Sequence, residues 1–304
     1  MRPRPWLLPL LAGLVAAASC DLAGANPPTP FVFPTPNQTL TAVFAPTETP
    51  VVQVGTFTPT PPPTTAPTVV TPAAFVPTAT LSSLSTRPNG IVLEAAWLGT
   101  LPTIDGDLTD WSSLPYSGDK VVFGSSDWTG VEDDSAKFGL GWDTTHLYLA
   151  VRVTDDEYVQ VATGADIWKG DEVELQVDAD LAADFYAASL SADDSQLGLS
   201  IGNFGSIPPQ SYRWHPLAKR GALATVTVAG RATPAGYDLE ARIPWAVFGI
   251  TPAEGGRYGF ALSISDNDLA GAAAQQSMVS SVSTRELTDP TSWGTLGLSA
   301  SQTK

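Results

Sequence analysis

A strict alternation of apolar and polar residues along the C-terminal two thirds of the chain most restricts its possible folds. Apolar side chains occupy every second position of 147–153, and Val173, Leu175 and Val177 alternate with polar residues. Successive side chains of a β-strand point to opposite faces, so this period of two predicts strands that bury one face. Many short strands of this kind predict an all-β fold, an antiparallel β-sandwich of jelly-roll or immunoglobulin-like type. The pattern recurs in six further stretches, 137–142, 197–201, 223–229, 237–243, 258–265 and 293–298.

One segment has the sequence of a short helical turn. In 243–249, Pro244 suits the first position of a helix and Gly249 suits its exit. The sequence therefore predicts a sandwich with one helical turn, which we expect to cover an end of the sheets. No repeat of 20 to 50 residues and no heptad pattern is present, which excludes solenoids and coiled coils.

The segment before the predicted strands has a different composition. Residues 26–88 contain 15 Pro and 16 Thr in 63 positions. Such a segment has few backbone donors, favours polyproline II and cannot assemble a core. We therefore predict a disordered linker over 21–88 and a single β-sandwich domain over 89–304.

The first twenty residues resemble a bacterial lipoprotein signal peptide. Arg2 and Arg4 precede an apolar run over 6–18, and small residues lead to Cys20, the single cysteine of the chain. We predict that residues 1–20 form this signal, that Cys20 is lipidated, and that the domain faces the periplasm or the cell exterior. The alternative is an ordinary export signal with an incidental cysteine.

Charge and residue types exclude several classes of function. With 31 acidic against 15 basic residues the net charge is -16, which argues against nucleic acid as a partner and against direct membrane contact. His146 and His215 are the two histidines, and no G-x-S-x-G, H-E-x-x-H or phosphate-binding glycine motif occurs. Glu172 and Glu174 share one face of a strand and so cannot flank a glycosidic bond from opposite sides. We predict no catalytic residue and no enzymatic activity.

Acidic residues at the ends of the predicted strands are candidate ligands of a metal ion. The segment 105–110 superficially resembles a calcium loop but lacks the closing glutamate. Carboxylates at the ends of strands often bind hard cations between loops, whereas acids that only solvate exposed turns are the alternative. The acids in question are Asp155, Asp156, Asp178, Asp180, Asp266 and Asp268.

Several short motifs, taken in order, resemble the family 9 carbohydrate-binding modules, which are DOMON-like β-sandwiches. The likeness spans about 200 residues, essentially the whole predicted domain, and rests on the order of the motifs rather than on any one of them. The motifs are Ile104-Asp105-Gly106-Asp107, Asp110-Trp111, Trp142-Asp143, 147–151 with Asp155, 168–175 with Asp178, Ile243-Pro244-Trp245, Gly259-Phe260 with Asp266, Asp289-Pro290 and Trp293-Gly294.

This resemblance implies a non-catalytic module that binds a plant-type polysaccharide or oligosaccharide between two tryptophans. Trp168 matches the first of these tryptophans, Glu174 matches a carboxylate that binds sugar hydroxyls, and Asp171 matches an acid of the same motif. These residue types suit a sugar ligand, because an indole face can cover the apolar face of a sugar ring while carboxylates bind its hydroxyls. The family also implies calcium as a structural cofactor, and neighbouring glycoside hydrolases or surface proteins as partners in carbohydrate catabolism.

The chain departs from the family pattern at two places. The second tryptophan is expected after Asp266, yet 269–292 contains no aromatic residue, and the arginine expected after Asp184 is absent from 185–189. The alternative interpretation is therefore a surface structural or adhesive domain that kept the sandwich and lost the sugar site.

Overall fold

A computed structural model describes residues 85–300 of the chain. The predicted signal peptide with Cys20, and the predicted linker as far as residue 84, lie outside the described residues. Within residues 85–300, none of the helices has the length and apolar character needed to cross a lipid bilayer.

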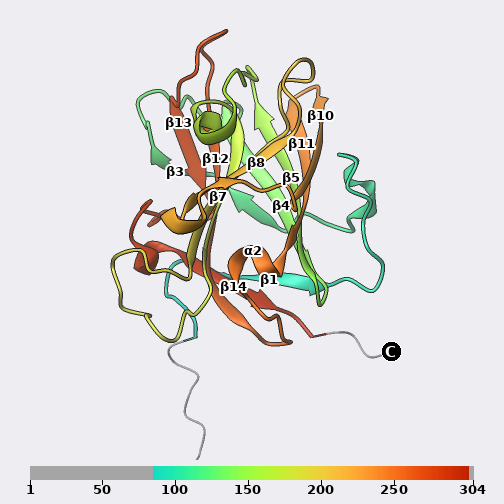
Figure 1. Cartoon of the computed structure of the whole chain (residues 1–304). Helices are drawn as coiled ribbons and strands as arrows, with labels where there is room; N and C mark the ends of the chain where they lie inside the picture. The colour runs from blue at the N-terminus through green and yellow to red at the C-terminus, as the bar shows by residue number, and fades with distance from the viewer. Residues whose placement is uncertain (1–84, 301–304) are drawn as a thin grey trace, which may run out of the picture. The chain divides into compact units, whose positions relative to one another are not determined.

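The described strands form two sheets that face each other (Figure 1). We call one the pocket sheet, in which β3, β13, β12, β6, β7, β8 and β9 follow one another, with β14 also beside β12. We call the other the back sheet, which runs β10, β11, β5, β4, with β2 also beside β4. The pocket-sheet strands are β3 (Lys120–Phe123), β6 (Glu172–Asp178), β7 (Asp194–Ser200), β8 (Gln210–His215), β9 (Gly221–Ala222), β12 (Arg257–Asp266), β13 (Ser277–Ser280) and β14 (Gly294–Leu298). The back-sheet strands are β2 (Tyr116–Gly118), β4 (Asp134–Trp142), β5 (His146–Asp155), β10 (Thr227–Thr233) and β11 (Gly236–Pro244).

Strand β1 (Val92–Trp97) belongs to both sheets. Its first four residues pair with β14, and Ala96 and Trp97 pair with β4, both in parallel orientation. The remaining described pairs are antiparallel, as the sequence predicts for a sandwich. Residues 92–97 do not alternate cleanly, so the sequence pattern does not reveal this strand or its change of sheet.

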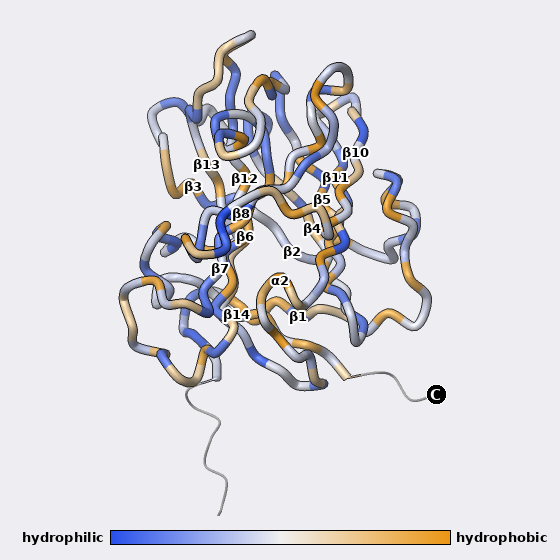
Figure 2. The backbone as a smooth tube through the Cα atoms, in the orientation of Figure 1, coloured by the Kyte–Doolittle hydropathy of each residue, from blue (hydrophilic) through white to orange (hydrophobic). Residues whose placement is uncertain are grey.

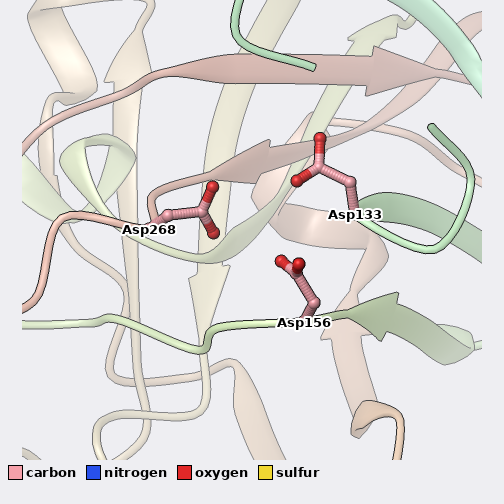
Figure 3. A group of neighbouring side chains, drawn as sticks. All are labelled: Asp133, Asp156 and Asp268. Atoms are coloured by element: carbon pink, nitrogen blue, oxygen red, sulfur yellow. The ribbon is translucent and has the colours of Figure 1, made fainter. Parts of the chain in front are cut away.

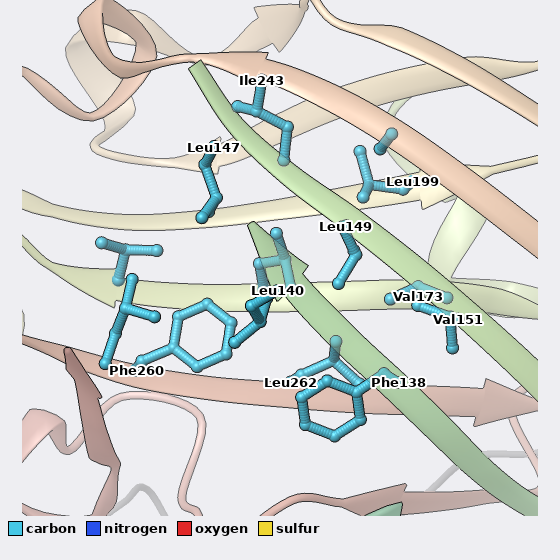
Figure 4. Close-up of a cluster of buried hydrophobic side chains, with 14 of the residues drawn as sticks. Phe138, Leu140, Leu147, Leu149, Val151, Val173, Leu199, Ile243, Phe260 and Leu262 are labelled. Atoms are coloured by element: carbon cyan, nitrogen blue, oxygen red, sulfur yellow. The ribbon is translucent and has the colours of Figure 1, made fainter. Parts of the chain in front are cut away.

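Between the two sheets lies the hydrophobic core (Figure 4). Phe138 on β4 and Leu149 on β5 face Val173 on β6 and Leu262 on β12, and all four side chains are fully buried. Each fully buried side chain of this size contributes about 1.5–3 kcal/mol relative to its exposed state. The tube coloured by hydropathy shows the apolar and polar residues interspersed along the strands (Figure 2).

Most predicted stretches coincide with strands, and one is wrong in its first half. The sequence pattern predicts a strand over 223–229, but β10 begins only at Thr227. The predicted helical turn is α2 (Trp245–Phe248), and it ends at Gly249, whose φ of 76° is left-handed. The other described helical turns are 3₁₀ turns: η1 (Leu108–Asp110), η2 (Gly164–Lys169), η3 (Leu217–Lys219) and η4 (Pro290–Ser292).

Arg87 falls inside the predicted linker, yet the structure packs it into the domain. Its side chain is 1% exposed and forms an ion pair of 2.9 Å with the fully buried Asp178 of β6. The same guanidinium donates to the carbonyl of Phe185 and lies over its ring, 4.9 Å from the centroid. The folded region therefore includes Arg87, which the composition assigned to the linker.

Candidate functional site

The 3₁₀ turn η2 holds Trp168 at the surface of the pocket sheet. Ile167 is fully buried and anchors the turn, whereas Trp168 is 36% exposed. Ser265 on β12 donates from Oγ to the Trp168 carbonyl at 2.9 Å, and Trp214 on β8 donates from Nε1 to the Ala165 carbonyl at 2.8 Å. The turn is thus tied to two strands, which presents the indole on a fixed support.

A lysine covers part of the exposed indole. The Lys169 ammonium lies 5.2 Å from the centroid of the Trp168 ring, where the negative face of the indole attracts it. Asp166, one turn earlier, pairs with Lys169 at 3.0 Å and holds the ammonium in place.

Glu174 projects from β6 on the face of the pocket sheet opposite the core, as the alternation predicts. Its side chain is 3% exposed, and its Oε2 accepts a hydrogen bond of 3.0 Å from Gln196 on β7. Its Oε1 accepts from Gln176 and from the guanidinium of Arg285. Three donors therefore compensate the burial of this carboxylate, which would otherwise be costly.

Trp168 and Glu174 line one pocket of about 540 Å³. This volume lies in the range of pockets that bind small molecules. Trp214, Arg285, Gln196 and Arg220 line it as well, so aromatic faces and polar groups meet in one cavity. The pocket can therefore cover an apolar ring face and bind the hydroxyls at its edge.

The structure does not bring Asp171 into this pocket. Asp171 is 2% exposed, and its carboxylate accepts from the backbone amides of Val159 and Asn267, the latter at 2.9 Å. Both oxygens are thus engaged in holding two loops together. We assign Asp171 a role in ordering these loops rather than in contacting a ligand.

Sequence reasoning missed Trp214 and Arg285, which also line the pocket. Trp214 comes from β8 rather than from the segment after Asp266, and its ring packs onto Gly198, where a side chain would collide with it. A glycine inside an alternating strand is a signal of such close approach. Arg285 lies 111 positions after Glu174 in an irregular segment, where no sequence pattern points to the pair.

Glu172 lies beside the pocket but does not line it. It is fully buried, and none of the described residues donates a well-formed hydrogen bond to either carboxylate oxygen. Burial, together with the neighbouring charge of Glu174, raises the pKa of Glu172 well above its usual value. Because Glu172 is fully buried and does not line the pocket, its carboxyl group is not placed to act on a bound sugar together with Glu174.

A second feature is a group of aspartates where the two sheets meet. Asp133, Asp156 and Asp268 place their carboxylates toward one another, with oxygens within 4.8 Å (Figure 3). Asp155 at the end of β5 and Asp266 at the end of β12 form a second such group, also with Asp268. The cluster therefore links the back sheet to the pocket sheet.

The donor set of this cluster fits a calcium ion. Asp155 accepts from the Glu157 amide at 2.9 Å through Oδ1, and Asp266 accepts from Ser277 at 2.9 Å through Oδ2. Their other oxygens, and Oδ1 of Asp268, are buried with no hydrogen-bond donor among the described residues. Burial and the neighbouring carboxylates raise the pKa of Asp155 to about 6 and that of Asp266 to about 7. A calcium ion needs several oxygen ligands, and these carboxylate oxygens, which accept no hydrogen bond from the described residues, can serve as such ligands.

Of the other acids considered as metal ligands, Asp178 pairs with Arg87 at 2.9 Å and Asp180 accepts from the Ala183 amide at 3.3 Å. In the segment 105–110, Asp105 accepts from the Asp107 amide and Asp107 accepts from the Thr109 amide, at 2.8 and 3.1 Å. Asp107 also pairs with Arg231 at 3.0 Å. This segment is thus a capped turn, in which the acids are occupied by protein donors.

Comparison with known proteins places the domain in a family. Residues 104–301 match the family model described as "Carbohydrate family 9 binding domain-like". Two solved structures of a family 9 carbohydrate-binding module from Caldicellulosiruptor kristjanssonii, in complex with cellotriose and with glucose, share its fold with a TM-score of 0.53 and 20% identity. The alignments cover 70% of this chain and 96% and 98% of those chains. No curated protein sequence matches the chain. Because the family model spans well over half of the chain, this protein belongs to the carbohydrate family 9 binding domain-like family.

Proposed function

We propose that the domain binds a plant-type polysaccharide or oligosaccharide, without hydrolysing it, in the pocket lined by Trp168 and Glu174. The observation that carries the proposal is the convergence of a partly exposed indole and a buried, fixed carboxylate on one pocket of about 540 Å³. Trp214 supplies a second aromatic surface, and Arg285 and Gln196 hold the carboxylate. In this arrangement the indoles cover the sugar ring while Glu174 accepts a hydroxyl hydrogen.

Membership of a family of binding modules supports this function, and the sugar complexes of the two structural neighbours agree with it. We further propose that the protein acts beside glycoside hydrolases in carbohydrate catabolism, where a binding domain would keep substrate near the enzymes. The alternative, an adhesive domain without a sugar site, is an outcome that the following experiment distinguishes.

Replacing Trp168 with alanine is expected to weaken glycan binding strongly. Stacking of a planar group on an aromatic side chain contributes about 1–3 kcal/mol, which corresponds to roughly 5- to 150-fold in affinity. The measurement is isothermal titration of the full chain with cello- and xylo-oligosaccharides. Tyr186→Ala is the matched control, since Tyr186 is 79% exposed and does not line the pocket. Absence of binding to every glycan at millimolar concentration would reject the proposal and favour the adhesive alternative.

We also propose that lipid on Cys20 holds the protein at the cell membrane, with residues 21–88 as a spacer. Two or more acyl chains anchor a protein stably, because each buried CH₂ contributes about 0.8 kcal/mol. In cells that express the full chain, the protein should sediment with membranes and incorporate labelled palmitate. A Cys20→Ser variant should lose both properties, and a variant that still carries label would refute lipidation at this residue.

Calcium is the cofactor that we propose for the aspartate cluster. It would bind the free oxygens of Asp155, Asp266 and Asp268, and its charge would offset the repulsion among them. Its role would be structural, because the cluster joins the ends of β5 and β12, on different sheets.

A further inference from the structure

The pocket extends beyond Trp168 and Glu174 onto a wall built by β3 and β13. Val122 and Phe123 from β3, Met278 from β13 and Gln275 just before β13 all line it. In the sheet, Met278 pairs with Phe123 on one side and with Ser265 on the other. This wall is thus continuous with Ser265, the residue that fixes the Trp168 turn.

The pocket is long in relation to one sugar ring. Its lining includes Phe123 on β3, Met278 on β13, Glu174 on β6, Gln196 on β7 and Trp214 on β8, and β12 lies between β13 and β6 in the sheet. Neighbouring strands lie about 4.8 Å apart, so these five spacings correspond to about 24 Å along the sheet. Phe123 is three spacings, or about 14 Å, from the strand that carries Glu174. A single sugar at Glu174 therefore leaves Phe123 uncovered, and Gln275, bound through Ser265 to the Trp168 turn, stands between the two positions.

The wall has the chemistry of a further sugar subsite. Phe123 is 50% exposed, so a flat aromatic surface faces the solvent beside the pocket. Gln275 donates from Nε2 to Ser265 Oγ at 2.8 Å, which orients its amide, and none of the described residues donates to its Oε1. An aromatic face with a nearby acceptor is the same combination that Trp168 and Glu174 offer in the main site.

Charge restricts the kind of sugar residue. Val122, Phe123, Gln275 and Met278 are all uncharged, so this part of the lining offers no cation to a carboxylate or sulfate. Binding of a charged sugar at this wall would remove its hydration without an opposite charge to compensate. The wall therefore favours a neutral residue.

We propose that Phe123 and Gln275 form an additional subsite that binds a further neutral sugar of an oligosaccharide whose other end lies at Trp168 and Glu174. The subsite rests on the proposed function of the main site, and it names the ligand class more closely: a neutral chain of several sugars rather than a single terminal unit. Phe123 is then a residue that determines preference for chain length.

The test compares ligands of increasing length. Glucose, cellobiose, cellotriose and cellotetraose, and the matching xylose series, are titrated by calorimetry into the full chain and into its Phe123→Ala variant. Affinity of the unmodified protein should rise with chain length. The variant should bind the longest ligands roughly 5- to 100-fold more weakly and the monosaccharide with unchanged affinity. Phe123→Tyr keeps the flat ring and should retain the preference, and Tyr186→Ala should leave the whole series unchanged.

The results separate the two proposals. Binding of the monosaccharide with no gain on lengthening, or an equal loss for all lengths in Phe123→Ala, overturns the subsite while leaving the main site intact. Failure of every ligand to bind the unmodified protein overturns the proposed function and the subsite with it. Because Phe123 is half exposed, a thermal melt of the variant is expected to match that of the unmodified protein.

Discussion

Replacement of Arg87 with alanine is expected to lower the free energy of unfolding by about 3–5 kcal/mol, because it leaves the buried charge of Asp178 without its partner. The pair is 2.9 Å long, and neither side chain is more than 1% exposed. Oδ1 of Asp178 already has no donor among the described residues. The loss should appear as a lower urea midpoint of the full chain.

The size of this loss should depend on pH. Burial raises the pKa of Asp178 to about 7, although the hydrogen bond from Arg87 opposes the shift. An aspartate of the unfolded chain titrates near ~3.9, so between these values the folded state binds more protons and stability falls as pH rises. At pH values below about 7 the carboxyl of the folded protein is mostly protonated, and a neutral carboxyl does not require the guanidinium. We therefore expect the Arg87→Ala cost to be small at pH 5 and full at pH 8.

Arg257→Ala is the matched control for this experiment. Arg257 pairs with Glu94 at 2.6 Å, but the two side chains are 30% and 40% exposed. Exposed pairs of this kind contribute about 0–1 kcal/mol, so the control should change the urea midpoint little at either pH. An Arg87→Ala loss that is equal at pH 5 and pH 8 would contradict an electrostatic origin of the loss.

Removal of the proposed calcium ion is expected to destabilise the protein by an amount that depends on the free calcium concentration. A ligand that binds only the folded state raises the free energy of unfolding by about 2.7 kcal/mol when its free concentration is 100 times the dissociation constant. At 1,000 times the dissociation constant the increase is about 4.1 kcal/mol. Titration of CaCl₂ into chelator-treated protein should raise the Tm progressively, and EDTA should reverse the change. Magnesium should be less effective, because it requires a smaller, octahedral site and keeps its water ligands.

Two variants assign the calcium effect to the aspartate cluster. Asp268 belongs to both groups of carboxylates, and Asp268→Asn should abolish most of the calcium-dependent rise in Tm. Asp127 is exposed and belongs to neither group, so Asp127→Asn should respond to calcium as the unmodified protein does. A Tm that is insensitive to both CaCl₂ and EDTA would exclude a calcium ion at this position.

In the candidate site, the local sequence pattern predicts the orientation of side chains but not their partners. The alternation along β6 predicts that Glu174 and Gln176 face away from the core, and both do, with hydrogen bonds between them. The same alternation does not predict which residues pack against that face. Glu174 meets Arg285 from a segment 111 positions later, and Trp168 shares its pocket with Trp214 from another strand. These partners come from irregular segments or from a strand without clear alternation, so only the fold brings them together.

By itself, the sequence determined the all-β class of the fold, because a period of two over many short stretches indicates strands that each bury one face against a shared core. It also determined the face on which Glu174 lies and the turn at 243–249. The tertiary structure alone decided which residues surround that face, where the aspartates converge and that Arg87 belongs to the domain. The physical reason is that periodicity reports which side of a strand is buried, whereas partners distant in sequence depend on how the strands are ordered in the sheets.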